Sequence, residues 1–178
     1  PSGPREPAAE PASAPPPNRH NLPRGVETLI GRNRELAQVQ ELIAAHRLVT
    51  VTGPGGVGKS RLVIDAAWAS VDRFADGVWL VELAALADPA LVPSAVTNAL
   101  RLAVAPSEEP LATLIQQLGD RRLLIVLDNC EHVVDAAASM LEAVLSAAPN
   151  AHALVSSQEL IGIVGEHVLR LPSLAVPA

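Results

Sequence analysis

The sequence predicts an α/β fold in which a mostly parallel, five-stranded sheet is flanked by helices. Short β-branched and aliphatic runs alternate with longer amphipathic segments, the order that produces parallel strands joined by helices. One run, residues 123–127, is continuously aliphatic, as in a parallel strand buried on both faces. A glycine-rich stretch, residues 53–60, follows the first expected strand. The 178 residues, 49% of them hydrophobic, suffice for one domain of this kind.

Each expected strand is a short run rich in Val, Leu, Ile or Ala. The strands are residues 47–52, 78–83, 123–127, 151–156 and 167–171. Apolar residues at helical spacing predict helices between these strands and ahead of the first one. The helices are residues 34–46, 61–70, 89–102, 111–120 and 131–147.

The stretch Gly53-Pro54-Gly55-Gly56-Val57-Gly58-Lys59-Ser60 fits the pattern G-x-x-x-x-G-K-[ST] without a mismatch. Its glycines let backbone N–H groups converge on phosphate oxygens, beside the positive end of the following helix. Lys59 adds a full charge, and the Ser60 hydroxyl suits magnesium. A connector without a ligand is the alternative, but the order strand, loop, helix argues against it. The sequence therefore predicts a P-loop (Walker A) NTPase fold that binds a nucleotide triphosphate.

A second magnesium-associated group is expected at the carboxyl end of another strand. Asp128 follows the aliphatic run and has this place, although an Asp there also suits a helix cap. Hydrolysis needs a group that orients water, and many such enzymes use a Glu directly after the Asp. Here that neighbour is Asn129. Glu131 is the nearest carboxylate, but the first turn of a helix also favours an acid. His132 is either a phosphate-side donor or, as we favour, a helix-surface residue.

Composition excludes several other classes of protein. A formal net charge of −6 offers no basic field, so no direct nucleic-acid binding by this segment is expected. Cys130 is the only cysteine, which excludes a disulfide framework, and we expect it to be buried. The sequence has no apolar run long enough to cross a membrane and no secretory leader, so we expect a cytoplasmic protein and no membrane contact.

The domain organisation follows from a change in composition. Residues 1–21 hold many of the 16 prolines and lack an apolar period, so a Pro/Ala-rich disordered linker is expected there. Residues 22–178 then form the nucleotide-binding domain. A linker at this place implies a further unit upstream, so we expect the chain to be a fragment of a larger protein.

The chain resembles the STAND class of signal-transduction ATPases, specifically the NB-ARC-like module of bacterial AfsR- and LuxR-type transcription regulators. The residues that carry the resemblance span nearly all of positions 22–178. They are Leu22-Pro23 with Leu29-Ile30-Gly31-Arg32, the loop from Thr52 to Arg61, Leu127-Asp128-Asn129-Cys130-Glu131-His132, Ser156-Ser157-Gln158-Glu159-Leu160, and the run from Asp76 to Leu83.

The resemblance implies an ATP-dependent molecular switch that controls self-association and transcription. ATP or ADP with Mg²⁺ would be the cofactor, and the absence of an Asn-Lys-x-Asp run favours ATP over GTP. The implied partners are effector and helical domains outside this chain and a second copy of it. Ile30, Gly31 and Arg32 would lie near the adenine or the phosphates, with a surface turn as the alternative for Arg32.

The complete set of expected site residues combines the motif and the resemblance. The nucleotide-binding residues are Ile30, Gly31, Arg32, Gly53, Pro54, Gly55, Gly56, Val57, Gly58, Lys59, Ser60, Arg61 and Gln158. The metal-associated residues are Ser60 and Asp128, and the catalytic residues are Lys59, Asp128 and Glu131.

Two positions depart from the family pattern. Asn33 stands where the pattern Gly-Arg-Glu-x-Glu has its first Glu, and Gln158 stands where Thr-Ser-Arg-Glu has the Arg thought to sense the terminal phosphate. We therefore expect nucleotide binding with slow or impaired hydrolysis. Two alternatives remain: a degenerate P-loop module that serves protein contacts, and a small-molecule P-loop kinase, whose Arg-rich lid the sequence does not show.

Overall fold

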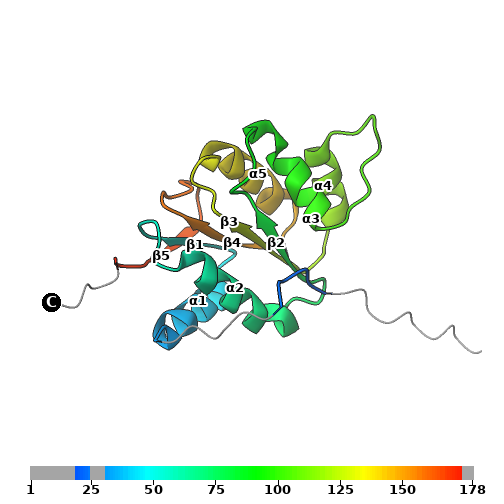
Figure 1. The fold of residues 1–178 in the computed structure, drawn as a ribbon. Coiled ribbons are helices and arrows are strands. Elements are labelled where there is room, and N and C mark those ends of the chain that lie inside the picture. Colours follow the sequence, from blue (N-terminus) through cyan, green and yellow to red (C-terminus); the bar gives the residue numbers. More distant parts are fainter. Residues whose placement is uncertain (1–18, 25–30, 174–178) are drawn as a thin grey trace, which may run out of the picture.

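Five strands form one sheet in the computed structural model, which describes residues 19–24 and 31–173 (Figure 1). The strands are β1 (Leu48–Thr52), β2 (Val78–Glu82), β3 (Leu124–Asp128), β4 (His152–Ser157) and β5 (Glu166–Arg170). The α-helices are α1 (Asn33–Ala45), α2 (Lys59–Ser70), α3 (Val92–Ala99), α4 (Pro110–Leu118) and α5 (Val134–Ala147), with short 3₁₀ helices η1 (Val71–Arg73) and η2 (Pro89–Leu91).

The strands are arranged in the order β2-β3-β4-β1-β5, and every neighbouring pair is parallel. Thr52, at the end of β1, pairs with Ser157 of β4, and Val155 of β4 pairs with Leu127 of β3. The carboxyl ends of these three strands therefore meet at one edge of the sheet. Because β4 lies between β1 and β3, its last residues separate the glycine-rich loop from Asp128.

Helices cover both faces of the sheet, with α1 and α2 on one face and α3, α4 and α5 on the other (Figure 1). Alternate strand residues point to opposite faces, which divides the apolar core in two. Val126 and Leu154 pack in the core beside α2, whereas Leu127 and Val155 pack in the core beside α5. Asp128, two residues beyond Val126, therefore faces the side of α2.

The predicted element order is confirmed, and the differences lie at the ends of elements. Helix α2 begins at Lys59, two residues earlier than expected, and α5 begins at Val134, three residues later. The expected helix over residues 89–102 divides into η2 and α3 and ends at Ala99. Arg101 has a φ of 57°, a left-handed conformation in which a right-handed helix does not continue.

Residues 19–23 form a segment that covers the outer edge of β2. His20 makes a parallel bridge with Val78, and the Val78 N–H donates to the Arg19 carbonyl. The Asn21 side chain pairs with both backbone groups of Leu80, at 2.6 and 2.9 Å. This segment satisfies backbone groups that an edge strand leaves free. Most of the linker expected over residues 1–21 lies outside the described residues.

Within residues 19–24 and 31–173, no helix combines the length and the apolar character needed to cross a bilayer.

Candidate nucleotide-binding site

A cleft of about 500 Å³ lies at the carboxyl edge of the sheet, where the ends of β1, β3 and β4 meet. In open parallel sheets this edge is where ligands bind. The cleft brings together residues of the glycine-rich loop, of the first turn of α2 and of the ends of β3 and β4. Its lining consists of Gly55, Gly56, Gly58, Lys59, Ser60, Arg61, Asn129, Glu131 and Gln158.

The glycine-rich loop joins β1 to α2 and depends on its glycines at two positions. Gly58 precedes α2 with a φ of 88°, a conformation that residues with a Cβ rarely adopt. A Cβ on Gly53 would lie 2.8 Å from the Leu171 carbonyl oxygen, so a side chain does not fit there. Between them Val57, 4% exposed, anchors the loop in the core beside α2. The conformation of the loop therefore requires glycine at Gly53 and Gly58.

Lys59 is the first residue of α2, and its side chain is buried against the loop. Its Nζ donates to the carbonyl oxygens of Gly53 at 2.8 Å and Pro54 at 3.0 Å. An ammonium group has three donors, so one remains for a further acceptor. Since α2 starts at Lys59, the free backbone N–H groups and the positive end of this helix lie at the cleft.

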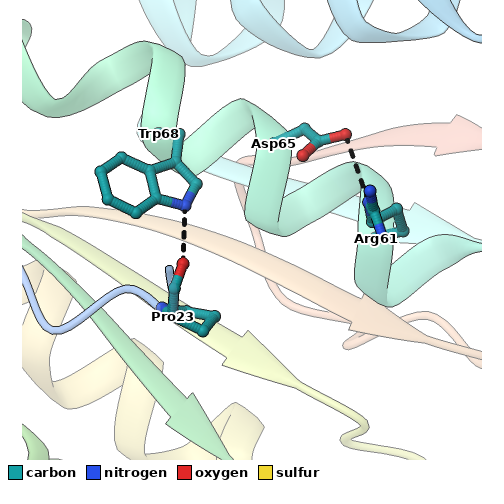
Figure 2. Close-up of polar contacts among 4 residues, drawn as sticks. All are labelled: Pro23, Arg61, Asp65 and Trp68. Carbon is teal, nitrogen blue, oxygen red and sulfur yellow. Dashed lines mark hydrogen bonds and ion pairs between the residues drawn. The ribbon is translucent and has the colours of Figure 1, made fainter. Parts of the chain in front are cut away.

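Ser60 and Arg61 line the cleft from the first turn of α2. The Arg61 Nε and Asp65 Oδ2 are 3.8 Å apart and form an ion pair along α2, marked by a dashed line in Figure 2. This distance is too long for a hydrogen bond, and Nε is buried without another partner among the described residues. Arg61 therefore lines the cleft with a charge that Asp65 partly balances.

Asp128 ends β3 and is 4% exposed. Its Oδ1 accepts a hydrogen bond from the Ser156 hydroxyl, whereas within residues 19–24 and 31–173 its Oδ2 has only the Asn129 side-chain amide, at 3.5 Å. A buried carboxylate needs strong partners, and this oxygen lacks one. Mg²⁺ typically keeps several waters and takes one or two carboxylates plus substrate phosphates. Asp128 with Ser60 fits that requirement, although the described residues include no cluster of three or more His, Cys, Asp or Glu side chains.

The residues after Asp128 turn sharply before α5 begins. Asn129 has a φ of 59° and lines the cleft. Glu131 lies in the loop before α5, so the interpretation that it is the acidic residue stabilised by the dipole in the first helical turn is wrong. Asp135 is the acidic residue in the first turn of α5. Glu131 lines this cleft and a neighbouring one of about 220 Å³.

Two neighbours of Glu131 have structural contacts. His132 is exposed, and its Nε2 lies 2.9 Å from the Leu86 carbonyl, which supports the surface interpretation. Cys130 is buried as predicted. Burial, followed by the charges of Glu131 and Asp128, raises the pKa of its thiol to about 12, so it is not a nucleophile at neutral pH.

The remaining expected residues approach the loop from other elements. The Arg32 guanidinium donates to the Val57 carbonyl at 2.7 Å, so Arg32 contacts the loop rather than forming a free surface turn. Gly31, exposed with a φ of 85°, precedes it, and Ile30 lies outside the described residues. Gln158 lines the cleft beside Gly55. A Cβ added to Gly55 would lie 3.3 Å from the Gln158 Nε2.

Ser156 is a site residue to which sequence reasoning gave no role. Its side chain is fully buried, and it bonds to the carboxylate of Asp128 and to the Asn129 N–H. The available signal was two serines, Ser156 and Ser157, at the end of an otherwise apolar strand.

Comparison with known sequences finds relatives in Mycobacterium and Streptomyces, and no protein-family model matches the chain. The uncharacterised protein Rv0894 of Mycobacterium tuberculosis is 38% identical over 158 residues, which are 89% of this chain and 40% of that protein. Rv0890c, provisionally named an HTH-type transcriptional regulator of the same organism, is 41% identical over 138 residues, 78% of this chain and 15% of that protein. The regulatory protein AfsR of Streptomyces griseus is 28% identical over 185 residues, 93% of this chain and 18% of that protein. The chain thus spans two fifths or less of these relatives.

Solved structures with the same fold include an ORC2 protein and a signal-transduction ATPase. The ORC2 protein of Aeropyrum pernix, solved in ADPNP and ADP complexes, has a TM-score of 0.63 at 14% identity, over 85% of this chain and 50% of that one. A STAND protein with a tetratricopeptide repeat sensor from Pyrococcus horikoshii has a TM-score of 0.56 at 17% identity, over 84% of this chain and 24% of that one. At these identities the likeness establishes the fold alone. The chain has the fold of the P-loop ATPases.

Proposed function

We propose that the chain is the nucleotide-binding switch module of a multidomain transcriptional regulator, and that it binds ATP or ADP with Mg²⁺ and hydrolyses ATP slowly. The observation that carries the proposal is the P-loop, with buried Lys59 in the first turn of α2, at a cleft beside the buried carboxylate of Asp128. The likeness in sequence to AfsR and the ADPNP and ADP complexes of ORC2 support it.

Phosphates would bind against the free N–H groups of the loop and of α2, with Lys59 and Arg61 supplying positive charge. Ser60 and Asp128 would hold Mg²⁺, which neutralises phosphate charge when bound. Ile30, Gly31 and Arg32 would lie near the adenine or the phosphates, and the contact between Arg32 and the Val57 carbonyl supports a place beside the loop. Glu131, the carboxylate that lines the cleft, is the candidate for orienting water.

Slow hydrolysis follows from two side chains at the cleft. Asn129 cannot act as a general base, because an amide has no basic site comparable with a carboxylate. Gln158 keeps a hydrogen-bond donor beside Gly55 but lacks the charge that an arginine would bring to a terminal phosphate. The module would therefore persist in its nucleotide-bound state.

The organisation of the whole protein is part of the proposal. Residues 1–21 would contain a Pro/Ala-rich linker, and residues 22–178 the P-loop domain of a larger cytoplasmic protein. Helical and effector domains and a second copy would be its partners. A net charge of −6 argues against direct nucleic-acid or membrane binding by this segment.

The experiment is a titration with fluorescent ATP and ADP in Mg²⁺, with Gln158→Arg as the test variant. Gln158→Arg should raise the preference for ATP over ADP, whereas Gln116→Arg, which adds the same charge on the exposed side of α4, should not. Turnover should stay far below the roughly 10 s⁻¹ of ordinary enzymes. Turnover at that rate would contradict slow hydrolysis, and failure to bind either nucleotide would favour a degenerate module that serves protein contacts.

A further inference from the structure

Ser156 lies between the P-loop and Asp128 because β4 lies between β1 and β3. It faces the same side of the sheet as Asp128, since each residue is two positions beyond a residue of the core beside α2, Leu154 and Val126. Its side chain is 0% exposed. A buried hydroxyl at this place must find its partners within the protein.

The Ser156 hydroxyl uses both of its hydrogen-bonding functions on the end of β3. It donates to Asp128 Oδ1 and accepts from the Asn129 N–H at 3.0 Å. The Ser156 backbone carbonyl accepts from the Cys130 N–H at 3.1 Å. One residue of β4 thus holds three successive residues at the point where the chain leaves β3.

These contacts fix which carboxylate oxygen of Asp128 is available. Oδ1 is occupied by the hydrogen bond from the Ser156 hydroxyl. Among the described residues, Oδ2 has only the amide of Asn129, at 3.5 Å, and therefore keeps its acceptor capacity. Asn129 itself has a left-handed φ of 59°, and the hydrogen bond from its N–H to Ser156 stabilises that turn.

We propose that Ser156 is a positioning residue for the magnesium site: its hydroxyl holds Asp128 by Oδ1 so that Oδ2 is presented to a hydrated Mg²⁺ bound with the nucleotide. The inference rests on the proposed nucleotide-binding function. Ser156 touches neither nucleotide nor metal in this role, so its loss should affect the Mg²⁺-dependent part of binding only.

The test compares ADP affinity in excess Mg²⁺ with ADP affinity in EDTA, for the wild type, Ser156→Ala and Ser156→Thr. The ratio of ADP affinity in Mg²⁺ to ADP affinity in EDTA should be about tenfold smaller in Ser156→Ala than in the wild type, because one hydrogen bond to a charged group has about this effect. The affinity of Ser156→Ala in EDTA should stay within about twofold of the wild type. Ser156→Thr, which restores a hydroxyl on a strand position, should recover the Mg²⁺ effect.

A matched control is Ser70→Ala, which removes a buried hydroxyl that donates to the Ala66 carbonyl within α2. It should leave the Mg²⁺ effect unchanged. Equal losses with and without Mg²⁺ in Ser156→Ala would mean a merely structural role and overturn the inference. A wild type that binds neither ADP nor ATP would overturn the proposed function and this inference together, whereas a Ser156→Ala variant with a full Mg²⁺ effect would overturn only the inference.

Amide hydrogen exchange supplies a readout that needs no ligand. Ser156→Ala should speed exchange of the Asn129 N–H about tenfold or more, because its acceptor is removed. The Cys130 N–H, which donates to the backbone carbonyl of Ser156, should change much less. Unchanged exchange at Asn129 would contradict the positioning of this turn by the Ser156 hydroxyl.

Discussion

The Asn21 side chain holds residues 19–23 against the outer edge of β2, and replacing it with alanine measures how much this contact adds to the free energy of unfolding. Asn21 Oδ1 accepts from the Leu80 N–H at 2.6 Å, and Asn21 Nδ2 donates to the Leu80 carbonyl at 2.9 Å. A hydrogen bond contributes about 0.5–1.5 kcal/mol net, so Asn21→Ala should lower the free energy of unfolding by about 1–3 kcal/mol. In a domain of this size, each kcal/mol corresponds to a fall in Tm of about 2–4 °C.

Urea unfolding followed by circular dichroism measures this change. Asn150→Ala is the control, because it removes a single exposed hydrogen bond, from Asn150 Nδ2 to the Asp120 carbonyl, and should cost less than about 0.5 kcal/mol. A chain that starts at Arg19 should keep the wild-type stability, and one that starts at Arg24 should lose at least as much as Asn21→Ala. An Asn21→Ala effect no larger than that of Asn150→Ala would refute the reasoning.

Three further predictions concern the stability of the framework. The Arg47 guanidinium donates to three carbonyls in the last turn of α5 and just after it, those of Leu145, Ala148 and Ala151. Arg47→Ala should therefore lower the free energy of unfolding in urea by about 2–3 kcal/mol, and Arg47→Lys should recover little of it because an ammonium lacks the planar fork of a guanidinium. A loss below about 0.5 kcal/mol in Arg47→Ala would contradict this. Asn129 has a φ of 59°, so Asn129→Gly should be nearly neutral, whereas Asn129→Glu should cost about 1 kcal/mol because Glu adopts a left-handed backbone less readily than Asn; an Asn129→Glu variant as stable as the wild type would count against this. Burial lowers the pKa of His152; the hydrogen bond to the His46 carbonyl opposes this shift, and the charges of Arg47 and Arg122 add to it. The unfolded chain, in which His152 has its ordinary pKa of about 6.5, therefore binds the proton at a higher pH than the folded chain. The stability present above that ordinary pKa should be lost as pH falls, with a smaller slope in His152→Gln, and identical slopes in the two proteins would contradict the assignment.

Much of the architecture follows from local pattern. The aliphatic run that forms β3 has no helical period and ends in an acid, so its burial in a parallel sheet could be read directly. The P-loop was equally clear, because its residue types are required by backbone geometry at Gly58 and by a close contact at Gly53. Both features were predictable because each depends on residues that are close together in the sequence.

Contacts between distant segments were not accessible in the same way. The order of the strands in the sheet is not encoded by any local pattern, and the place of β4 between β1 and β3 is what brings Ser156 to Asp128. The docking of Asn21 on Leu80 joins residues 59 positions apart, within a segment whose composition indicated a linker. Glu131 was expected in a helix because nothing in the sequence indicated the left-handed turn at Asn129.

The central claim is that the cleft beside Lys59 binds a nucleotide, and calorimetric titration of the wild type and Lys59→Ala with ADP and Mg²⁺ tests it most directly. Lys59 has one donor left for a phosphate oxygen, and a charge-assisted hydrogen bond contributes about 1.5–3 kcal/mol, so Lys59→Ala should weaken binding by about one to two decades. Arg121→Ala, which removes an exposed positive charge ahead of β3, should leave the affinity unchanged. Saturable binding by the wild type that Lys59→Ala loses is the predicted result; no binding by the wild type, or equal affinity in Lys59→Ala, would contradict the account.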